Sequence, residues 1–554
     1  MEKHWKRGIC LLLAVFCTGM FGCRPPQKES SGALSAESMT VGEGIPESPA
    51  SGNAVSESAA QSGLPSETTI TGEATGEGTT YKGTTSNAAT NGGASAKTTT
   101  SRGTVSTSAD SSSQRPQEDS KATLSGTFIQ SWLCASWSDE RWGQELSMLK
   151  ELGMRYIILG DSATRNTNGN WFFWYPTEIQ SFNAQYNGVD VIKNALRNCQ
   201  KYGMKVFVGV GMDERWWNNF VRQPRWLNSY IKQSGRIAEE LYNKYHSRYP
   251  DAFYGWYWPP EIWNDPLFKA ASDSRSESIR VLAEAMSALR DQLTRLNPNM
   301  PMLFSPFANT HVDKETWDST GKWYNGCTSE EYYRFWKDLI SQVSFLPEDI
   351  LCPMDSIGGG GCEMSYLEEW TRSYSRAVID SGRKIRLWSN CETFQGLVDG
   401  YPAITMDQYL QQIRTVSKYC DEIVSFAYSH YYSPYNVSGG FHKAYSYYVK
   451  HGGLEKQKPS APTQFTFRRD GGSVYLSWNA ASDNLGVVGY NVYRNGIRIS
   501  RVYAQRNDGK GWIPGVGTTA VDTTAGNSGK SIQYGVSAFD ASGNESEIVT
   551  LVCS

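Results

Sequence analysis

The middle of the chain alternates between short hydrophobic runs, rich in β-branched and aromatic residues, and longer stretches whose apolar residues recur at helical spacing. The short runs predict strands, which we place at Phe128–Trp132, Tyr156–Leu159, Val206–Val210, Phe253–Trp258, Met302–Ser305, Ile350–Pro353, Ile385–Trp388 and Ile423–Phe426. The longer stretches predict helices, which we place at Trp142–Leu152, Val189–Tyr202, Leu227–Tyr245, Ser276–Leu296, Ser329–Val343, Ser365–Asp380, Met406–Tyr419 and Lys443–Val449.

This succession of strands and helices predicts the architecture of residues 126–455. A (β/α)₈ TIM barrel has this order of elements, and it places functional side chains where its strands end. An open, doubly wound α/β sheet is the alternative. The number of alternations and the lack of a glycine-rich phosphate-binding loop argue against that sheet.

A different pattern runs through residues 459–554. Apolar and polar residues alternate with period two in Val474–Trp478, Val488–Arg494 and Ile532–Asp540. Between these runs, Asn495-Gly496 is a strong signal for a hairpin turn. The pattern predicts a separate, all-β immunoglobulin-like sandwich.

Three aromatic residues give the C-terminal stretch a family resemblance. Trp478, Tyr490 and Tyr534 match the core Trp, the strand-C Tyr and the tyrosine corner of fibronectin type III domains. The resemblance covers the whole stretch and implies that the sandwich is a fibronectin type III domain. Such domains are commonly appended to bacterial enzymes that degrade polysaccharides, which supports an enzyme upstream by association.

Residues 1–22 have the layout of a signal peptide, in which basic residues precede an apolar run too short to span a bilayer comfortably. The run ends in Met20-Phe21-Gly22-Cys23, which resembles a bacterial lipobox. This motif predicts cleavage before Cys23 and acylation of the Cys23 sulfur. The protein would then be lipid-anchored to the outer face of the membrane, at the bacterial cell surface. An ordinary secretory signal that is cut elsewhere is the alternative.

Residues 23–125 are dominated by Ser, Thr, Gly and Ala, and their sparse apolar residues follow no period. Such a segment cannot bury enough surface to offset the entropy cost of ordering it, so we predict a disordered stalk. As a flexible coil of about a hundred residues, it would reach roughly 50–60 Å. We expect it to hold the folded part of the protein clear of the membrane.

Composition narrows the possible partners. The net charge is −3 and no long basic run occurs, which argues against a nucleic-acid partner. Aromatic residues make up 13% of the chain and include 19 Trp, a content that suits a cleft for the flat faces of sugar rings. The 11 Cys form no CxxC pair and only six His are present, so we expect neither a metal nor another cofactor. We expect the protein to act as a monomer.

Two carboxylates follow predicted strands that lie on opposite sides of the barrel mouth. Pro259 and Pro260 end the fourth strand, because proline cannot donate to a sheet ladder, and Glu261 comes next. A lone acid there is costly to desolvate, but it suits a group that gives and takes protons in a cleft. Glu392 follows the seventh strand. A pair of carboxylates among aromatic residues is the arrangement that hydrolyses glycosidic bonds.

Other residues near the predicted strand ends are candidates for binding a substrate: Trp132, Asp161, Asp213, Trp258, His311, Asp355, Trp388, Asn390 and Tyr428. Asp355, which precedes four consecutive glycines, is also the rival of Glu392 for the role of second carboxylate. Its structural alternative is a turn-stabilising Asx residue. For Asp161 and Asp213 the structural alternative is a helix N-cap, and for His311 it is a satisfied histidine.

Residues from about 127 to 450 resemble the superfamily of (β/α)₈ glycoside hydrolases, and most closely a bacterial branch described as a domain of unknown function. In the retaining members of that superfamily, the acid/base follows strand four and the nucleophile follows strand seven. The resemblance therefore implies that Glu261 is the acid/base and Glu392 the nucleophile. One departure is Pro260, which stands where the best-known pattern has an Asn that contacts the sugar 2-hydroxyl. Asn390 is a candidate to replace that contact.

These observations support one hypothesis and two alternatives. The hypothesis is a cell-surface lipoprotein that hydrolyses glycosidic bonds of an extracellular polysaccharide or glycan by a two-carboxylate mechanism. The first alternative is a glycan-binding or adhesion protein that does not cleave its ligand. The second is a structural surface protein with an inert barrel. The placement of Glu261 and Glu392 in the folded chain bears on all three.

Overall fold

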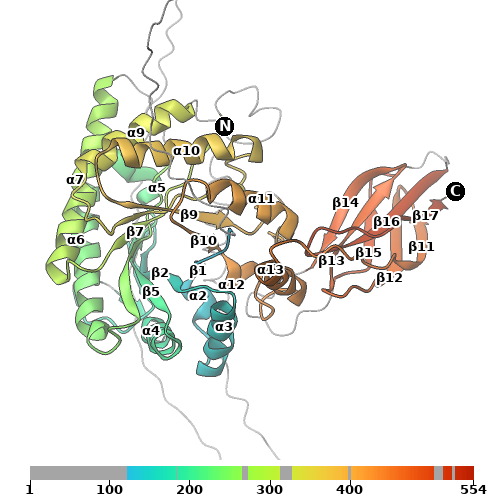
Figure 1. Cartoon of the computed structure of the whole chain (residues 1–554), viewed down its shortest axis with the longest axis horizontal. Coiled ribbons are helices and arrows are strands. Elements are labelled where there is room, and N and C mark those ends of the chain that lie inside the picture. Colours follow the sequence, from blue (N-terminus) through green and yellow to red (C-terminus); the bar gives the residue numbers. More distant parts are fainter. Residues whose placement is uncertain are drawn as a thin grey trace, which may run out of the picture. The chain divides into compact units, whose positions relative to one another are not determined.

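The computed structural model describes residues 122–182, 184–186, 188–264, 272–311, 327–396, 398, 401–504, 516–526 and 531–553, and for residues 272–276 it describes the backbone alone. These residues form an α/β barrel followed by two antiparallel sheets (Figure 1). The predicted signal peptide over residues 1–22, the lipidation at Cys23 and most of the predicted stalk lie outside the described residues.

The barrel domain begins before residue 126, where the sequence pattern placed its start. Leu124 N–H donates to the hydroxyl of Tyr445, and the hydroxyl of Tyr448 donates to the carbonyl of Ala122, each at 2.8 Å. Tyr445 and Tyr448 both belong to the last helix of the barrel domain. Residues 122–125, which we assigned to the stalk, are therefore part of the barrel domain.

Within the described ranges, eight parallel strands close into a barrel, which confirms the predicted fold class (Figure 1). Their order is β1 (Gly126–Ile129), β2 (Tyr156–Arg165), β5 (Lys205–Asp213), β6 (Phe253–Trp258), β7 (Met302–Phe304), β8 (Ile350–Leu351), β9 (Arg386–Glu392) and β10 (Glu422–Phe426). The ring is closed because β1 pairs with both β10 and β2. The carboxyl ends of all eight strands therefore meet at one mouth.

Several strand boundaries differ from the prediction, and three of these differences bear on the barrel mouth. β1 ends at Ile129, and Ser131–Cys134 form the short helix α2. β2 continues to Arg165, which pairs with Asp213 at the end of β5. β9 continues to Glu392, so this carboxylate stands on the last residue of a strand and not in a loop. For β2 and β9 the apolar pattern ends too early, because polar residues at a barrel mouth still belong to the hydrogen-bonded ladder.

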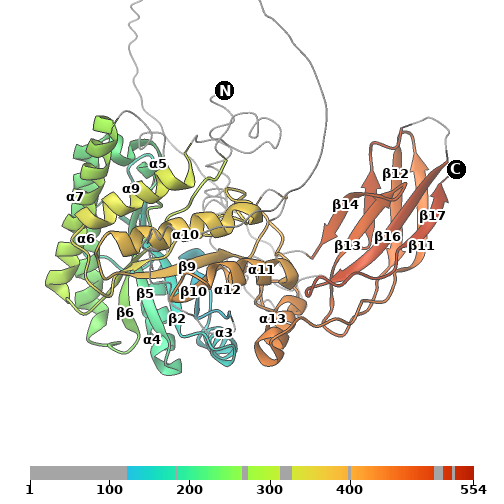
Figure 2. The same cartoon turned by 45° about the horizontal axis from the view of Figure 1, so that its top comes forward.

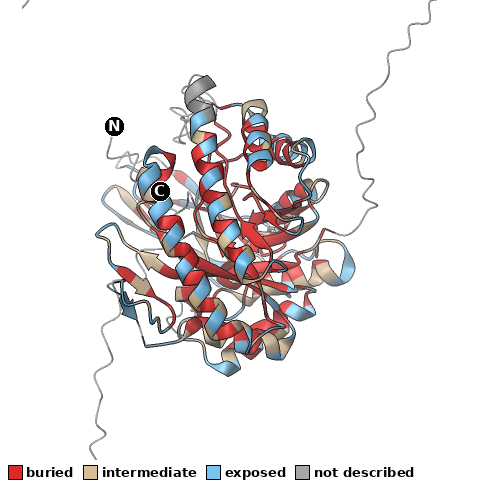
Figure 3. Ribbon diagram, turned by 90° about the vertical axis from the view of Figure 1, so that its left-hand side faces the viewer, coloured by how far each residue is buried: buried red, intermediate tan, exposed pale blue. Residues whose placement is uncertain are grey.

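Helices surround the barrel, with buried faces toward the strands and exposed faces toward solvent (Figure 3). The long ones are α3 (Asp139–Glu151), α4 (Val191–Tyr202), α6 (Pro224–Leu241), α7 (Ser272–Leu296), α9 (Ser329–Gln342), α10 (Met364–Asp380), α11 (Met406–Val416) and α13 (Gly439–His451). Their ends follow local rules: Thr328 and Glu331 form a capping box for α9, and Gly203 ends α4 with φ 69°. The helical turns α5 (Trp216–Asn219) and α12 (Tyr428–Tyr431) were missed because four residues show no period.

Two apolar layers stabilise the barrel. The inner layer fills the ring with side chains such as Phe128, Phe207 and Leu303. Phe128 on β1 contacts Tyr257 on β6 with ring centroids 5.3 Å apart, although these strands are not neighbours, so the contact crosses the interior. The outer layer lies between the strands and the helices and contains most of the buried tryptophans.

The aromatic run after the second predicted strand forms part of the sheet. Trp171–Phe173 is strand β3, which lies antiparallel to β2, and β4 (Ala184–Tyr186) pairs with it in turn. The rings of Trp171, Phe173 and Tyr175 are buried. This run therefore belongs to the core.

Strand β5 passes β2 at a point where only glycine fits. The register shifts between Leu159 and Asp161, and this bulge sets the direction of the Asp161 side chain. A Cβ atom on Gly209 would lie 2.3 Å from the Gly160 carbonyl oxygen. We expect Gly209→Ala to lower the free energy of unfolding by about 2–3 kcal/mol, because rigid backbone must move. Urea unfolding checks this against Gly453→Ala, a site with nothing within 4 Å, and equal losses would contradict the prediction.

The C-terminal residues fold as predicted into an all-β sandwich of two antiparallel sheets (Figure 2). One sheet has the order β11 (Thr463–Asp470), β12 (Ser473–Asn479) and β15 (Thr519–Asp522), and the other β14 (Ile497–Tyr503), β13 (Val487–Arg494), β16 (Ile532–Asp540) and β17 (Val549–Cys553). Trp478, Tyr490 and Tyr534 are buried in its core. The hydroxyl of Tyr534 donates to Oδ2 of Asp522 at 2.8 Å.

Candidate active site

Glu261 lies just past the end of β6, where Pro259 and Pro260 have ended the strand. Its side chain is only 8% exposed. Trp216 Nε1 donates to the Glu261 carbonyl at 2.7 Å and fixes the backbone of the acid, while Oε2 has no hydrogen-bond partner among the described residues. A buried carboxyl oxygen in this state is available to a proton or to a ligand.

Glu392 is the last residue of β9 and is 3% exposed. Gly359 N–H donates to Glu392 Oε2 at 2.7 Å, from the run of glycines that follows β8. The next residue back must also be glycine, because a Cβ atom on Gly358 would lie 2.8 Å from the Glu392 Cβ atom and 2.7 Å from the Phe394 carbonyl oxygen. The glycine run therefore lets the backbone approach the carboxylate and donate to it.

The electrostatics of the two carboxyl groups are linked. Burial, and then the charge of Glu392, raise the pKa of Glu261 to about 8. Burial also raises the pKa of Glu392 to about 7, while hydrogen bonds from the backbone N–H groups of Gly359 and Gly358 hold it down. Glu392 is thus the first of the pair to ionise, and Glu261 keeps its proton near neutral pH. One acid beside one carboxylate is what general acid catalysis with a nucleophile or base requires.

Asp355 lies next to Glu392 but differs from it in its hydrogen bonds and in its pKa. Its Oδ1 accepts hydrogen bonds from the backbone N–H groups of Glu392 and Ile357, each at 3.2 Å. Burial and the charge of Glu392 raise the pKa of Asp355 well above its ordinary value. A carboxyl group with a raised pKa ionises less readily, and Oδ1 of Asp355 is already occupied by two backbone N–H donors, so Glu392 is favoured over its rival as the second carboxylate.

Asn390 and His311 lie near the strand and the glycine run that hold Glu392. Asn390 is two residues before Glu392 on β9 and so shares its face of the strand; its amide donates to Ser305 Oγ at 3.2 Å. His311 Nε2 lies 3.4 Å from the carbonyl oxygen of Gly360 in the glycine run. Contact of these two residues with a substrate stays a prediction.

The two aspartates predicted to contact a substrate have protein partners. Asp213 is fully buried; Arg215 Nε and Nη2 donate to its two carboxylate oxygens at 2.9 and 2.5 Å, and Arg165 lies 3.7 Å away. Asp161 accepts a hydrogen bond from the Thr164 hydroxyl. These contacts account for both aspartates without a substrate, and neither one caps a helix as the sequence alternative proposed.

Three aromatic residues predicted to bind a substrate belong to the core, and we correct that prediction. Trp258 and Trp388 are each 1% exposed, in the outer and inner apolar layers respectively. The Tyr428 ring is fully buried against Tyr445 of α13, and its hydroxyl is 2.8 Å from His442 Nδ1. The error at Trp258 and Trp388 arose because residues of a strand point alternately to opposite sides and the sequence does not say which side is which, whereas Tyr428 stands on the short helix α12.

Trp132 is the predicted aromatic residue that remains accessible, since it is partly buried on α2. Its Nε1 donates to Gln130 Oε1 at 2.5 Å, and its ring meets the His430 ring edge to face with centroids 5.4 Å apart. The His430 ring in turn stacks on Phe426, at the end of β10. The sequence analysis did not single out Gln130 as a partner of Trp132. Its polar side chain directly after β1 was the available signal for a residue near the mouth.

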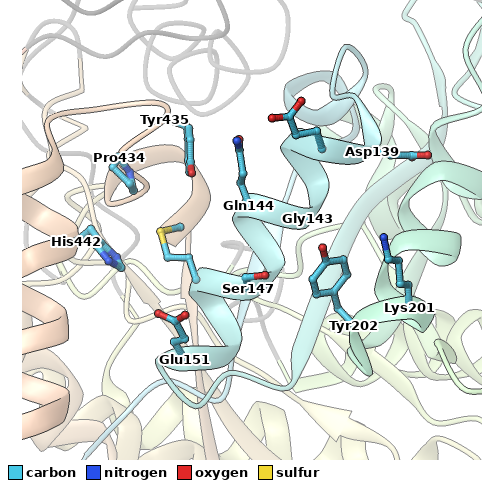
Figure 4. Close-up of a pocket in the computed structure, with 12 residues that line it drawn as sticks. Asp139, Gly143, Gln144, Ser147, Glu151, Lys201, Tyr202, Pro434, Tyr435 and His442 are labelled. Carbon is cyan, nitrogen blue, oxygen red and sulfur yellow. The ribbon is translucent and has the colours of Figure 1, made fainter.

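A groove on the outer wall of the barrel is separate from these carboxylates. It has a volume of about 680 Å³ and surrounds α3, with Tyr435 and His442 on one side and Lys201 and Tyr202 on the other (Figure 4). Neither Glu261 nor Glu392 lines it. Across the described ranges, no three His, Cys, Asp or Glu side chains are placed to hold a metal ion, and no helix combines the length and apolar character needed to cross a bilayer.

In structure, the chain is similar to a proposed alpha-L-fucosidase from Bacteroides thetaiotaomicron, with a TM-score of 0.46 and 18% identity over 59% of this chain and 95% of that one. It is also similar to the endo-beta-1,4-mannanase from Thermotoga petrophila, with a TM-score of 0.37 and 11% identity over 78% of this chain and 97% of that one. Both scores are below 0.5, so the assignment of a barrel rests on the strand order itself.

In sequence, a segment of 72 residues is 43% identical to an alpha-amylase from Niallia circulans. The segment is 13% of this chain and covers 4% of that protein, so it does not reach the length of a barrel domain. A family model described as Domain of unknown function (DUF4434) matches residues 124–438, which include all eight barrel strands and are more than half of the chain. The chain therefore belongs to the family of that description.

Proposed function

We propose that this protein is a glycoside hydrolase in which Glu261 is the acid/base and Glu392 the nucleophile of a retaining mechanism. The observation that carries the proposal is the pair itself. Two buried carboxyl groups stand at the ends of β6 and β9, the charge of Glu392 acts on Glu261, and their pKa values of about 8 and 7 place one proton between them near neutral pH. Burying two carboxyl groups together lowers the stability of the fold, whereas their raised pKa values suit acid–base catalysis.

The proposed reaction has two steps. In the first, the Glu392 carboxylate bonds to the anomeric carbon while the bond from that carbon to the leaving oxygen breaks, and Glu261 gives its proton to the leaving oxygen. In the second, water bonds to the anomeric carbon and loses a proton to Glu261, while the bond to Glu392 breaks. The N–H of Gly359, which already contacts Glu392 Oε2, stays with the carboxylate as its charge is consumed and returned.

A two-part experiment tests the proposal. Aryl glycosides and polysaccharides would be screened for hydrolysis, and the protein would be treated with 2-deoxy-2-fluoroglycosyl fluorides of any sugar that is cleaved. These reagents slow the second step and leave the sugar on the nucleophile. We expect mass spectrometry to find the label on Glu392. A label on Asp355, or inversion at the anomeric carbon without any label, would overturn the assignment.

The glycan-binding alternative makes a distinct prediction in the same screen. A protein of that kind would bind a glycan at the barrel mouth, with no release of reducing ends after long incubation. Weaker binding in Glu261→Gln or Glu392→Gln would favour it further, since a pair that serves only catalysis contributes little to ground-state affinity.

We also propose that the barrel is carried at the bacterial cell surface by a lipid on Cys23, that residues 23–125 form a disordered stalk, and that the C-terminal sandwich is a fibronectin type III domain. The proposed substrate is then a polysaccharide or glycan outside the cell. What supports this arrangement is the Met20-Phe21-Gly22-Cys23 motif, the Ser- and Thr-rich composition, and the core residues Trp478, Tyr490 and Tyr534.

Cys23→Ala is expected to move the protein from the detergent phase to the aqueous phase in a Triton X-114 separation of expressing cells. The loss of the acylated sulfur removes the anchor, because one or two acyl chains supply most of the membrane affinity of such a protein. Cys17→Ala, in the same leader, is the matched control and should leave partition unchanged. Equal partition of the Cys23→Ala variant and the wild type would refute lipidation at this residue.

A further inference from the structure

Asp355 is a buried acid that the proposed reaction does not use. It lies just past β8, in a stretch that continues the pairing with β9. Asp355 N–H donates to the Asn390 carbonyl at 2.9 Å, and Asn390 N–H donates to the Pro353 carbonyl at 2.8 Å. Asp355 is therefore held in the sheet next to the strand that carries Glu392, with 4% of its surface exposed.

One oxygen of Asp355 joins Glu392 to the glycine run. Oδ1 accepts from the backbone N–H groups of both Glu392 and Ile357. The glycine run that starts after Ile357 then returns to Glu392, because Gly359 N–H donates to its Oε2. These contacts form a closed ring through Asp355, Ile357, Gly359 and Glu392, which fixes both the backbone and the carboxylate of Glu392.

The other oxygen of Asp355 has no hydrogen-bond partner among the described residues and is buried. Glu392 and Cys391 on β9, Cys362 after the glycine run and Tyr409 on α11 are titratable groups that interact with Asp355, and none of these four carries a positive charge. A second negative charge beside Glu392 in this buried setting would be strongly unfavourable. A proton on Oδ2 avoids that cost and leaves Oδ1 free to accept its two hydrogen bonds.

We propose that Asp355 is a positioning residue for the reaction proposed above, a neutral acid that aims the Glu392 carboxylate and leaves the negative charge of the site on Glu392 alone. The inference rests on the proposed function. It differs from a turn-stabilising role, because the side chain acts on the catalytic strand and not only on its own loop.

Two substitutions separate geometry from charge. Asp355→Ala removes the acceptor for Glu392 N–H and Ile357 N–H, and we expect kcat to fall by about 10²-fold with KM within a few-fold, as for a misplaced catalytic group. Asp355→Asn keeps an acceptor oxygen and cannot ionise. Its kcat should therefore be at least tenfold higher than that of Asp355→Ala, with the pH profile of the wild type. Asp470→Ala, at an exposed aspartate of the sandwich, is the control. An Asn variant as inactive as Glu392→Gln, or an Ala variant as active as the wild type, would overturn the inference.

Amide hydrogen exchange supplies a readout that does not depend on activity. In Asp355→Ala, we expect faster exchange in peptides that contain residues 355–362 and 390–396, because the ring of contacts has opened. The Asn variant should exchange at the wild-type rate in both peptides, and it replaces the Ala variant if the latter does not fold. Unchanged exchange in Asp355→Ala would overturn the inference. If the wild-type protein cleaves no glycan, the proposed function fails, while the exchange result still shows whether Asp355 holds Glu392 and the glycine run in place.

Discussion

Replacing Glu392 with Gln is expected to lower kcat by about 10⁴-fold or more on every glycoside that the wild-type protein cleaves. The amide keeps the shape of the side chain but cannot form the bond to the anomeric carbon, and the loss of a covalent nucleophile elsewhere costs up to about 10⁶-fold. Steady-state kinetics measures the effect. Added azide should restore turnover in a Glu392→Gly variant and give a glycosyl azide of inverted configuration, since a small anion then occupies the place of the carboxylate.

The matching experiment on Glu261 depends on the leaving group. Glu261→Gln should reduce kcat/KM by roughly 10²–10⁴-fold on natural glycosides, because the leaving oxygen must then depart without a proton. A 4-nitrophenyl leaving group needs no such help, so its first step should be far less affected. Glu547→Gln, at an 86% exposed side chain of the sandwich, is the control. The same loss on both classes of substrate would contradict the role of acid in the first step.

The stability of the protein is expected to fall as the pH rises from about 5 to about 9. In the unfolded chain the two glutamates lose their protons near pH 4.5, whereas in the folded protein their pKa values are about 8 for Glu261 and about 7 for Glu392. The folded state therefore binds more protons between these values, and its free energy of unfolding decreases with increasing pH. The decrease from each group is on the order of 3–5 kcal/mol.

Glu261→Gln and Glu392→Gln isolate this contribution, because an amide does not titrate. Each variant should match the wild type near pH 5 and be more stable near pH 9, which urea unfolding at several pH values measures. The exposed Glu547→Gln variant should follow the wild type throughout, since an ion pair in water contributes little. A variant with the same pH dependence as the wild type would show that the pair is not strained in the folded state. The test needs no substrate.

The elements of the barrel were predictable from sequence because their cause is local. The strand from Phe253 to Trp258 has the predicted bounds, since the two prolines that follow it stop any ladder. The glycine at position 203 marks the end of α4 for a similarly local reason. Errors occurred where the cause was a partner strand, as at Glu392, whose place in β9 is decided by its pairing with Phe426.

The side on which a residue points was the main limit on the site. Trp258 and Trp388 stand on barrel strands, as expected, but one faces the helices and the other fills the ring. The candidates for substrate binding, which were chosen by their position near strand ends, therefore included residues of the core. A shift of one position reverses the direction of a side chain, and a short strand does not specify that position by itself.

The amino-acid sequence alone determined the order of eight strands and their helices, the sandwich that follows them, and the carboxylates that stand where strands four and seven end. These follow from the period of apolar residues and from proline and glycine, which act within a few positions. Only the tertiary structure decided that Asp355 supports Glu392, that Asp213 is held by arginines, and that the glycine run donates to the catalytic strand. Apart from the local pair of Arg215 and Asp213, those contacts join segments tens of residues apart, and burial and charge become specific only when such segments meet.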